Sequence, residues 1–215
     1  MREDIKIMAQ RCFGPTKTTL VLATVAFLGA CTIQLVTPYD EVMDEGLMTF
    51  NQDFLQFMGK IKQEVPGEDG SYASNTDFYN TQQAALGTLV QRAKAIDPAG
   101  SCASTEATLG ALERVSSVAL PQEVKTQPLP TGSCTTILLT FIQEQLTETA
   151  CFHQLIYGQV STSCASLGFT QADAQGLQNA PLTTKLTLLD QVQSAVTTSV
   201  TAAMTLELAK KPSAT

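Results

Sequence analysis

The sequence predicts an all-α protein, an up-down four-helix bundle with a short extra helix in one connector, stabilised by disulfides. The chain has no Trp, few aromatic residues and 44% hydrophobic residues, a composition that suits packed helices better than a β-sandwich. Four long stretches repeat apolar residues every three or four positions, which is the period of a helix. Stretches rich in Pro and Gly separate them. The 215 residues are enough for one domain of ordinary size.

The first 30 residues are organised like a secretory signal. Four basic residues precede Leu20, and only Thr24 is polar among residues 20–30. Such a run is short for a membrane span and typical of a signal peptide. Its end, Leu28-Gly29-Ala30-Cys31, resembles the bacterial lipobox, in which a peptidase cuts before a cysteine that carries a diacylglycerol. The resemblance implies a lipoprotein signal peptide over residues 1–30 and a lipid on Cys31.

Two alternatives remain open at this end of the chain. An uncleaved anchor from about Thr18 to Val36 would need Gln34 near the membrane interface, and Met8 is an alternative start because the segment before the apolar run is long. Both membrane arrangements place the rest of the chain outside the inner membrane. Thr32 stands where enterobacterial lipoproteins held at the inner membrane have Asp. We therefore expect the cell envelope, with the outer membrane favoured over the inner.

After Ala30 the chain has nine basic and 18 acidic residues, a net charge of −9. Because an acidic surface repels phosphate, we expect no nucleic-acid partner. Residues 31–38 form the lipidated N-terminus and a spacer, and the seven residues from Thr32 reach about 25 Å at most. The helical domain, residues 39–211, should therefore stay close to the membrane surface.

The first long helix has the clearest pattern, with spacings of 4, 3, 4, 3 and 4 that predict packing along one seam. The inward residues are Met43, Leu47, Phe50, Phe54, Phe57 and Ile61. Acidic residues in its first turns (Asp40, Glu41, Asp44, Glu45) complement the helix dipole. This role explains the acidic cluster better than a weak cation site does. Pro66-Gly67 ends the helix.

The second helix is expected from Ser71 or Asn75 to Ile96, followed by a turn at residues 97–100. The connector after it is weakly patterned, with a short helix predicted over Thr108 to Val118. The third helix should run from Cys134 to Tyr157. The fourth should run from Pro181 to Lys210 with Leu182, Leu189, Val196, Val200 and Ala203 among its inward residues, and residues 212–215 form a loose tail.

With Cys31 lipidated and Cys12 removed with the signal, four cysteines remain in an oxidising compartment: Cys102, Cys134, Cys151 and Cys164. Cys134 and Cys151 lie roughly 25 Å apart on one helix and cannot pair. The up-down order predicts the pairs Cys102–Cys134 and Cys151–Cys164. We expect no metal site and no cofactor, because there is no Cys-x-x-Cys and only one histidine.

No catalytic motif occurs, and the sequence predicts that the protein is not an enzyme. The single histidine, His153, is expected to be a packed or half-exposed side chain. Glu144 and Glu148 share a helix face at i, i+4 and are expected to form a solvated stripe.

The stretch "LVTPYDEVMDEGLMTFNQDFLQFM" and the ending "LELAKK" resemble a group of small, uncharacterised bacterial lipoproteins. In that group a Tyr-Asp pair begins a long helix soon after the lipidated cysteine, and the chain ends in a comparable helix. The match covers roughly 40 residues at the two ends of the exported domain. It implies anchoring and a helical fold and adds no catalytic residue.

Two functions fit these observations. The first is a membrane-anchored periplasmic or surface lipoprotein whose bundle binds an envelope protein as an interaction or scaffold module. The alternative is a bundle that binds a small apolar or cationic ligand, with Met43, Met48 and Met58 among the residues of a pocket rather than of the core.

Overall fold

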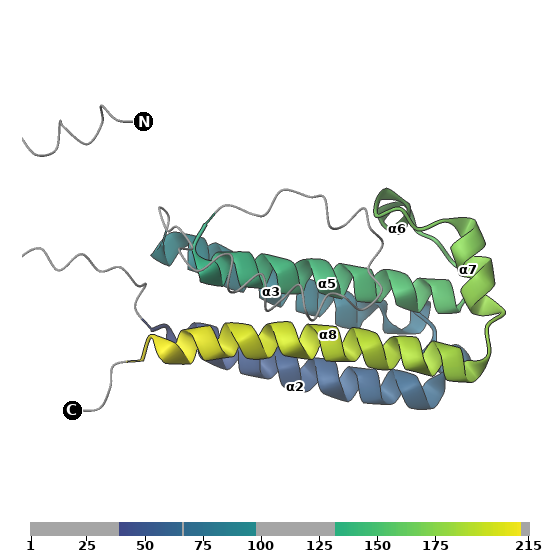
Figure 1. Ribbon diagram of the computed structural model, residues 1–215, viewed down its shortest axis with the longest axis horizontal. Coiled ribbons are helices and arrows are strands. Elements are labelled where there is room, and N and C mark those ends of the chain that lie inside the picture. The colour runs from purple at the N-terminus through teal and green to yellow at the C-terminus, as the bar shows by residue number, and fades with distance from the viewer. Residues whose placement is uncertain (1–38, 66, 98–131, 212–215) are drawn as a thin grey trace, which may run out of the picture. The chain divides into compact units, whose positions relative to one another are not determined.

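Four long antiparallel helices pack around one apolar core in the computed structural model of the protein (Figure 1). The structure describes residues 39–65, 67–97 and 132–211. The helices are α2 (Glu41–Glu64), α3 (Thr76–Ile96), α5 (Cys134–Ile156) and α8 (Leu182–Ala209). The all-α bundle predicted from the sequence is confirmed.

Helix α2 follows its predicted seam closely. All six residues of the 4-3-4-3-4 pattern are buried in the core, and Met58 joins them. Asp40 caps the helix, since its carboxylate accepts a hydrogen bond of 3.0 Å from the backbone N–H of Val42. The helix ends at Glu64, directly before Val65 and Pro66, because proline disfavours helical geometry in the residue before it.

A compact connection turns the chain from α2 into α3. It contains two 3-10 turns, Glu68–Gly70 and Ala73–Asn75.

Helices α2 and α3 approach closely at Gly46, where a Cβ atom would lie 2.8 Å from Cδ2 of Leu89. A larger residue at 46 would therefore force the Leu89 side chain to shift.

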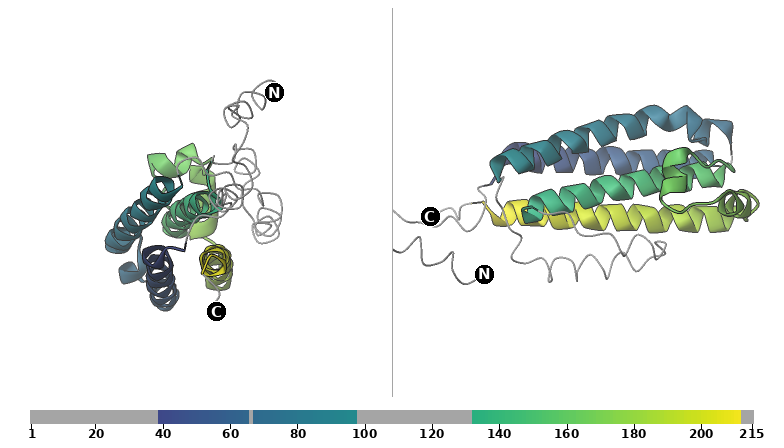
Figure 2. Two further views of the ribbon diagram at one scale, coloured as in Figure 1. Left: turned by 90° about the vertical axis from the view of Figure 1, so that its left-hand side faces the viewer. Right: turned by 90° about the horizontal axis from the view of Figure 1, so that it is seen from above.

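Each long helix packs against its neighbours in the sequence, and α8 closes the ring against α2, as the end-on view in Figure 2 shows. Contacts between the end of one helix and the start of another show that these helices run antiparallel. Lys62 near the end of α2 reaches Asp190 near the start of α8. Thr135 at the start of α5 meets Glu207 at the end of α8. The predicted up-down-up-down topology follows.

Two short helices, α6 (Thr162–Ser166) and α7 (Gln171–Gln178), lie between α5 and α8, where the sequence pattern predicted no helix. A local signal for α7 was present. Thr170 and Asp173 form a capping box, in which each side chain bonds the other's backbone N–H. Ser161 likewise caps α6. These helices are too short for periodicity to reveal them.

One expected core position is wrong: Leu182, the first residue of α8, is 44% exposed. Leu182 precedes the part of α8 that packs on the bundle. The apolar repeat in the sequence therefore begins before the first residue that contacts the core. The predicted connector helix at 108–118, the spacer and signal segment, and the tail lie outside the described residues. None of the described helices combines the length and the apolar character needed to cross a membrane.

Candidate functional site

The start of α2 and the end of α8 meet at one end of the bundle, which we call the base. Its polar side chains come from all four long helices or the residues flanking them: Tyr39, Asp40, Arg92, Thr135, Glu207, Lys210 and Lys211. These residues include the Tyr-Asp pair and the "LELAKK" ending. The two stretches that resemble the lipoprotein group therefore lie together in space.

Arg92 at the end of α3 clamps the start of α2. Its guanidinium donates two hydrogen bonds to the Asp40 carboxylate, with Nη2 3.0 Å from Oδ1. This bond, together with the backbone donors, lowers the pKa of Asp40. The same carboxylate thus caps α2 and ties it to α3, which fixes the point where the chain enters the bundle.

An ion pair is buried at the end of α8. The Lys210 ammonium lies 2.6 Å from Oε1 of Glu207, and their side chains are only 6% and 1% exposed. The hydroxyl of Thr135 donates to the same carboxylate oxygen at 2.5 Å and accepts from Lys210 at 2.7 Å. The three groups form a closed triangle that joins α8 to α5, so both buried charges are compensated.

The outer rim of the base joins the two ends of the domain. The Lys211 ammonium lies 4.9 Å from the centre of the Tyr39 ring, a cation–π contact. The Tyr39 hydroxyl donates to Asp44 at 3.0 Å. The residues that follow the predicted spacer are therefore held against the last turn of α8.

At the far end of the bundle, His153 is fully buried, as expected for a packed histidine. Its Nδ1 lies 3.0 Å from the Tyr79 hydroxyl, and its Nε2 lies 2.6 Å from the carbonyl oxygen of Gly70. A carbonyl only accepts, so Nε2 carries the proton and Nδ1 accepts from Tyr79. Burial lowers the pKa of His153 and keeps the ring neutral.

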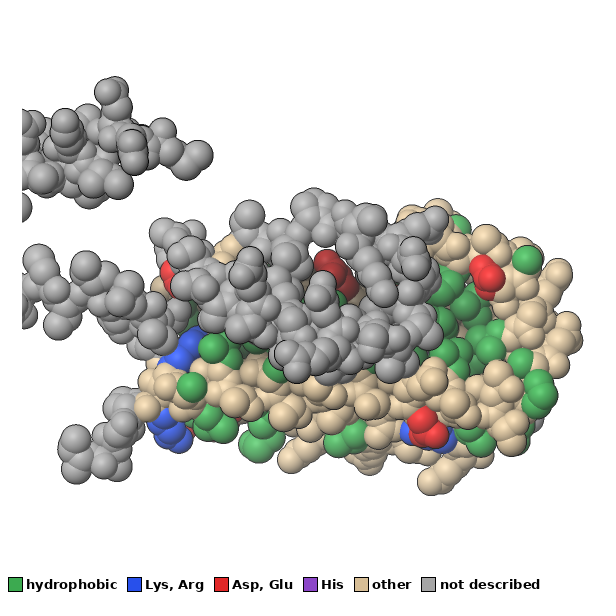
Figure 3. Space-filling view, viewed as in Figure 1, with side chains coloured by type: hydrophobic (Ala, Val, Ile, Leu, Met, Phe, Trp, Pro, Cys, Tyr) green, Lys and Arg blue, Asp and Glu red, His purple; other side chains and the backbone are tan. Residues whose placement is uncertain are grey.

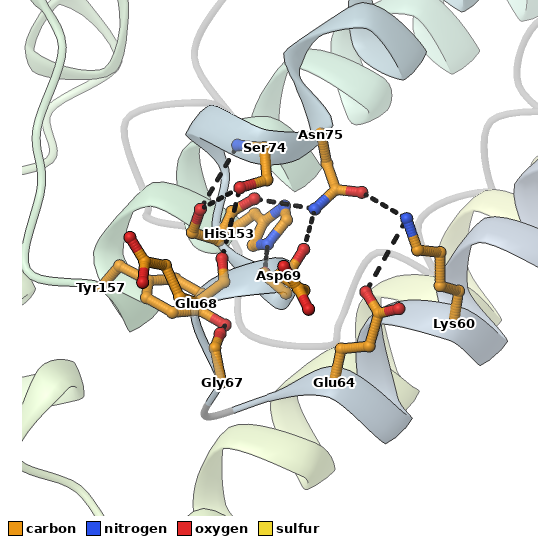
Figure 4. A network of polar contacts seen from close by, with 11 residues as sticks. Lys60, Glu64, Gly67, Glu68, Asp69, Ser74, Asn75, His153 and Tyr157 are labelled. Carbon is orange, nitrogen blue, oxygen red and sulfur yellow. Dashed lines mark hydrogen bonds and ion pairs between the residues drawn. The ribbon is translucent and has the colours of Figure 1, made fainter.

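The histidine belongs to a polar network around the α2–α3 connection (Figure 4). Asn75 donates to the carbonyls of Asp69 and Ser71, both at 2.8 Å, and accepts from Lys60 at 3.2 Å. Tyr157 donates to the carbonyl of Gly67 at 3.0 Å. These side chains satisfy the carbonyls of an irregular segment, which is a structural role.

The expectation that Glu144 and Glu148 form a solvated stripe is wrong for Glu148, which is only 6% exposed. Burial, with a smaller contribution from the Glu144 charge, raises the pKa of Glu148 to about 7. The pKa of Glu144 is raised by burial as well. The i, i+4 spacing was correct, but the sequence gives no sign of the low-dielectric surroundings.

The disulfide Cys151–Cys164 is present, as predicted, and joins α5 to α6. Both cysteines are buried in a second small cluster with Leu155, Phe169 and Ala174. Cys134 is also disulfide-bonded. Its predicted partner Cys102 and the predicted lipid site Cys31 lie outside the described residues.

A groove of about 570 Å³ runs between α2 and α3. Phe57 and Phe78 line it and stack with ring centres 3.7 Å apart. Asp53 and Asp77 stand on its walls, one on each helix, and Gln82 donates to Asp53 at 3.0 Å. The methionines expected to line an internal pocket are arranged differently, because Met43 and Met58 are core residues and Met48 is exposed.

Within the described ranges no group of three or more His, Cys, Asp or Glu residues is arranged to hold a metal ion. No protein-family model, curated protein or solved structure matches this chain. The function is therefore inferred from the residues of the base and of the exposed helix faces.

Proposed function

We propose that the protein is a bacterial envelope lipoprotein, anchored through a lipid on Cys31, whose helical bundle acts as an interaction or scaffold module. The outer membrane is favoured, with the domain in the periplasm or at the cell surface. The observation that carries this proposal is the construction of the base. A short spacer would connect the anchor to the end of the bundle where the Arg92–Asp40 ion pair joins α3 to α2 and where hydrogen bonds of Thr135 join α5 to the Glu207–Lys210 pair of α8.

The base suits attachment at that end for a physical reason. A tether transmits force and orientation only if the residues it joins do not fray, and chain ends normally do. Here Asp40 is held by Arg92, and Tyr39 contacts Lys211. The first and last described residues of the domain are thereby held together at the base.

The solvent face of α8 is the surface we assign to a protein partner. Six exposed threonines lie along α8: Thr183, Thr184, Thr187, Thr198, Thr201 and Thr205. Among the exposed residues from 183 to 205, Asp190 alone is charged. The surface over α8 in Figure 3 is accordingly mostly uncharged.

These threonines are poor choices for helix stability, since each costs up to about 0.7 kcal/mol relative to alanine. Thr187, Thr198, Thr201 and Thr205 donate their hydroxyl hydrogens to carbonyls four residues earlier. Their donors are therefore already satisfied, and methyl groups remain to contact a partner. Such a face loses little hydration when it is covered.

The anchor is tested with Cys31→Ser. Because only a thiol accepts the diacylglycerol, the variant should remain an uncleaved precursor without fatty-acid label after metabolic labelling. Label retained on the variant would contradict the lipid site at Cys31.

The partner surface is tested with Thr201→Lys on α8 and with Thr88→Lys on α3 as a matched control. Thr88 is likewise exposed and donates to the carbonyl four residues earlier. Lysine has the higher helix propensity, so neither change should unfold its helix. A protein that co-purifies stoichiometrically from detergent-solubilised envelopes should be lost with Thr201→Lys and kept with Thr88→Lys. Equal retention by both variants would contradict the α8 surface.

A second candidate function is binding of a small cationic ligand in the groove between α2 and α3. The specific observation is that two carboxylates, Asp53 and Asp77, line this groove with the stacked Phe57 and Phe78 and with one cation, Lys60. Carboxylates and aromatic faces both attract organic cations. Native mass spectrometry of the purified protein would detect a bound small molecule, and Asp77→Asn should weaken its retention.

A further inference from the structure

Helix α2 carries a second periodic stripe on its solvent side, separate from the core seam. The stripe consists of Glu45, Met48, Gln52, Leu55, Gly59 and Lys62, with spacings of 3, 4, 3, 4 and 3. Met48 is 47% exposed and Leu55 is 36% exposed. This is the spacing that two helices use when they pack side by side. Within its own bundle, α2 packs through its core seam, and of the stripe Lys62 also reaches α8.

The contacts within one copy of the chain do not explain why residue 59 of α2 is a glycine. A glycine inside a helix costs roughly 1 kcal/mol relative to alanine. The glycine at 46 has a reason, because a Cβ there would collide with Leu89. At Gly59 nothing lies within 4 Å of the position of a Cβ, and the site is open. We call this open space at Gly59 the notch. Because it lies on the same stripe as the exposed Met48, it is suited to receive a side chain from a second helix.

We propose that two copies of this chain pair through α2, antiparallel, around a twofold axis that passes between Gln52 and Leu55. The stripe is symmetric about that point. Met48 of one copy then fills the notch at Gly59 of the other, and Gln52 meets Leu55 of the second copy. Glu45 lies opposite Lys62 at both ends. One self-complementary surface thus serves both copies, as a twofold interface requires.

Charge decides the direction of the pairing. A parallel arrangement would place Glu45 beside Glu45 and Lys62 beside Lys62, which repel. The antiparallel arrangement replaces both repulsions with opposite-charge pairs. The Lys62 ammonium has three donors and uses two of them for Asp190 and Gln193 of its own chain. The third donor is left for Glu45 of the second copy.

The pairing has a geometric consequence for a membrane-anchored protein, which depends on the proposed anchor at Cys31. The 24 residues of α2 span about 36 Å, whereas the predicted spacer reaches about 25 Å. Because antiparallel copies carry their anchors at opposite ends, two anchors reach one membrane only if the paired helices lie along its surface.

The direct test is cross-linking of the full-length chain in detergent, with the double variant Met48→Cys/Gly59→Cys. These positions are about 16 Å apart within one helix, so a shorter thiol cross-linker joins them only between copies. The double variant should give a covalent dimer, and the parent chain, with its native cysteines, should not. Met48→Cys alone should stay monomeric. A dimer formed by that single variant would indicate a parallel arrangement and overturn the proposal.

Two further variants test the same surface without cysteines. Gly59→Tyr fills the notch, and because the site is open it should leave the thermal midpoint of the monomer unchanged. We expect it to raise the dimer dissociation constant at least about tenfold in analytical ultracentrifugation. Glu45→Lys should weaken the dimer in the same direction. A parent chain that is monomeric at every concentration, or dimers indifferent to both changes, would overturn the self-pairing, whether or not another protein occupies this face.

Discussion

The Tyr79 hydroxyl, from α3, donates a hydrogen bond of 3.0 Å to Nδ1 of His153, from α5, inside the bundle core. The contact joins α3 to α5 through two residues that are 74 positions apart in the sequence. The carbonyl of Gly70 fixes the tautomer of His153, because it accepts from Nε2 and leaves Nδ1 as the acceptor for Tyr79.

Tyr79→Phe should therefore lower the free energy of unfolding by about 1 to 2 kcal/mol. The change leaves the buried Nδ1 acceptor without a donor while keeping the ring packed. Urea denaturation of parent and variant measures the difference. Tyr157→Phe is the control, because its hydroxyl bonds an exposed carbonyl and its loss should cost about 0.5 kcal/mol or less. Equal effects would contradict the buried role of Tyr79.

Glu148 should make the protein less stable as the pH rises from 4.5 through about 7. Its pKa in the folded protein, about 7, is above the usual glutamate value of 4.5, so the folded state binds the proton more tightly. The stabilisation is complete below pH 4.5 and is lost as the pH passes 7. Glu148→Gln should remove this dependence and raise the stability at pH 8 by about 2 to 3 kcal/mol.

His153 contributes a slope of opposite sign in the parent and in the Glu148 variant alike. The pKa of His153 is lowered below 6.5 in the folded protein. Its contribution to the stability of the fold is therefore complete above pH 6.5 and is lost on acidification. The difference between the two proteins at each pH therefore isolates Glu148. A difference that does not change between pH 4 and pH 8 would contradict the raised pKa.

Phe54→Ala should destabilise the bundle by about 3 to 5 kcal/mol, because the ring is fully buried and its removal leaves a cavity. Since such domains have only about 5 to 15 kcal/mol of stability, the thermal midpoint should fall visibly. Gln52→Ala, two residues earlier on the solvent face, should change the midpoint little. A stable Phe54→Ala variant would contradict the core assignment.

Glu207→Gln should cost about 3 kcal/mol, because it leaves the buried Lys210 ammonium without its counter-charge. The double variant Glu207→Leu/Lys210→Met removes both charges and should be within about 1 kcal/mol of the parent. Chemical denaturation of the three proteins measures both effects. Additive losses in the double variant would contradict a coupled pair.

Non-reducing peptide mapping should recover Cys151 linked to Cys164 and, as predicted from the topology, Cys102 linked to Cys134. Replacing Cys151 and Cys164 by alanine should cost about 3 kcal/mol, the value for closing a loop of this length. A peptide linking Cys134 to Cys151 would contradict both the pairing and the continuity of α5.

The long helices were predictable because their signals are local. In α2 the seam from Met43 to Ile61 repeats at the helix period, and all of its members are buried. The helix α7 escaped prediction although Thr170 and Asp173 form its capping box. Eight residues contain too few apolar positions for a period to be recognised.

The sequence alone determined the four long helices, their order and the Cys151–Cys164 pair, since each depends on periodicity, on punctuation by Pro and Gly, or on the spacing of cysteines relative to one helix. The tertiary structure decided which polar residues meet and how deeply they are buried. Asp40 finds Arg92, Thr135 finds Glu207, and Glu148 lies in surroundings that raise its pKa. These contacts join residues from different helices or depend on burial by the whole bundle. Electrostatic energies depend on distance and dielectric, and neither quantity exists along the sequence until the chain has folded.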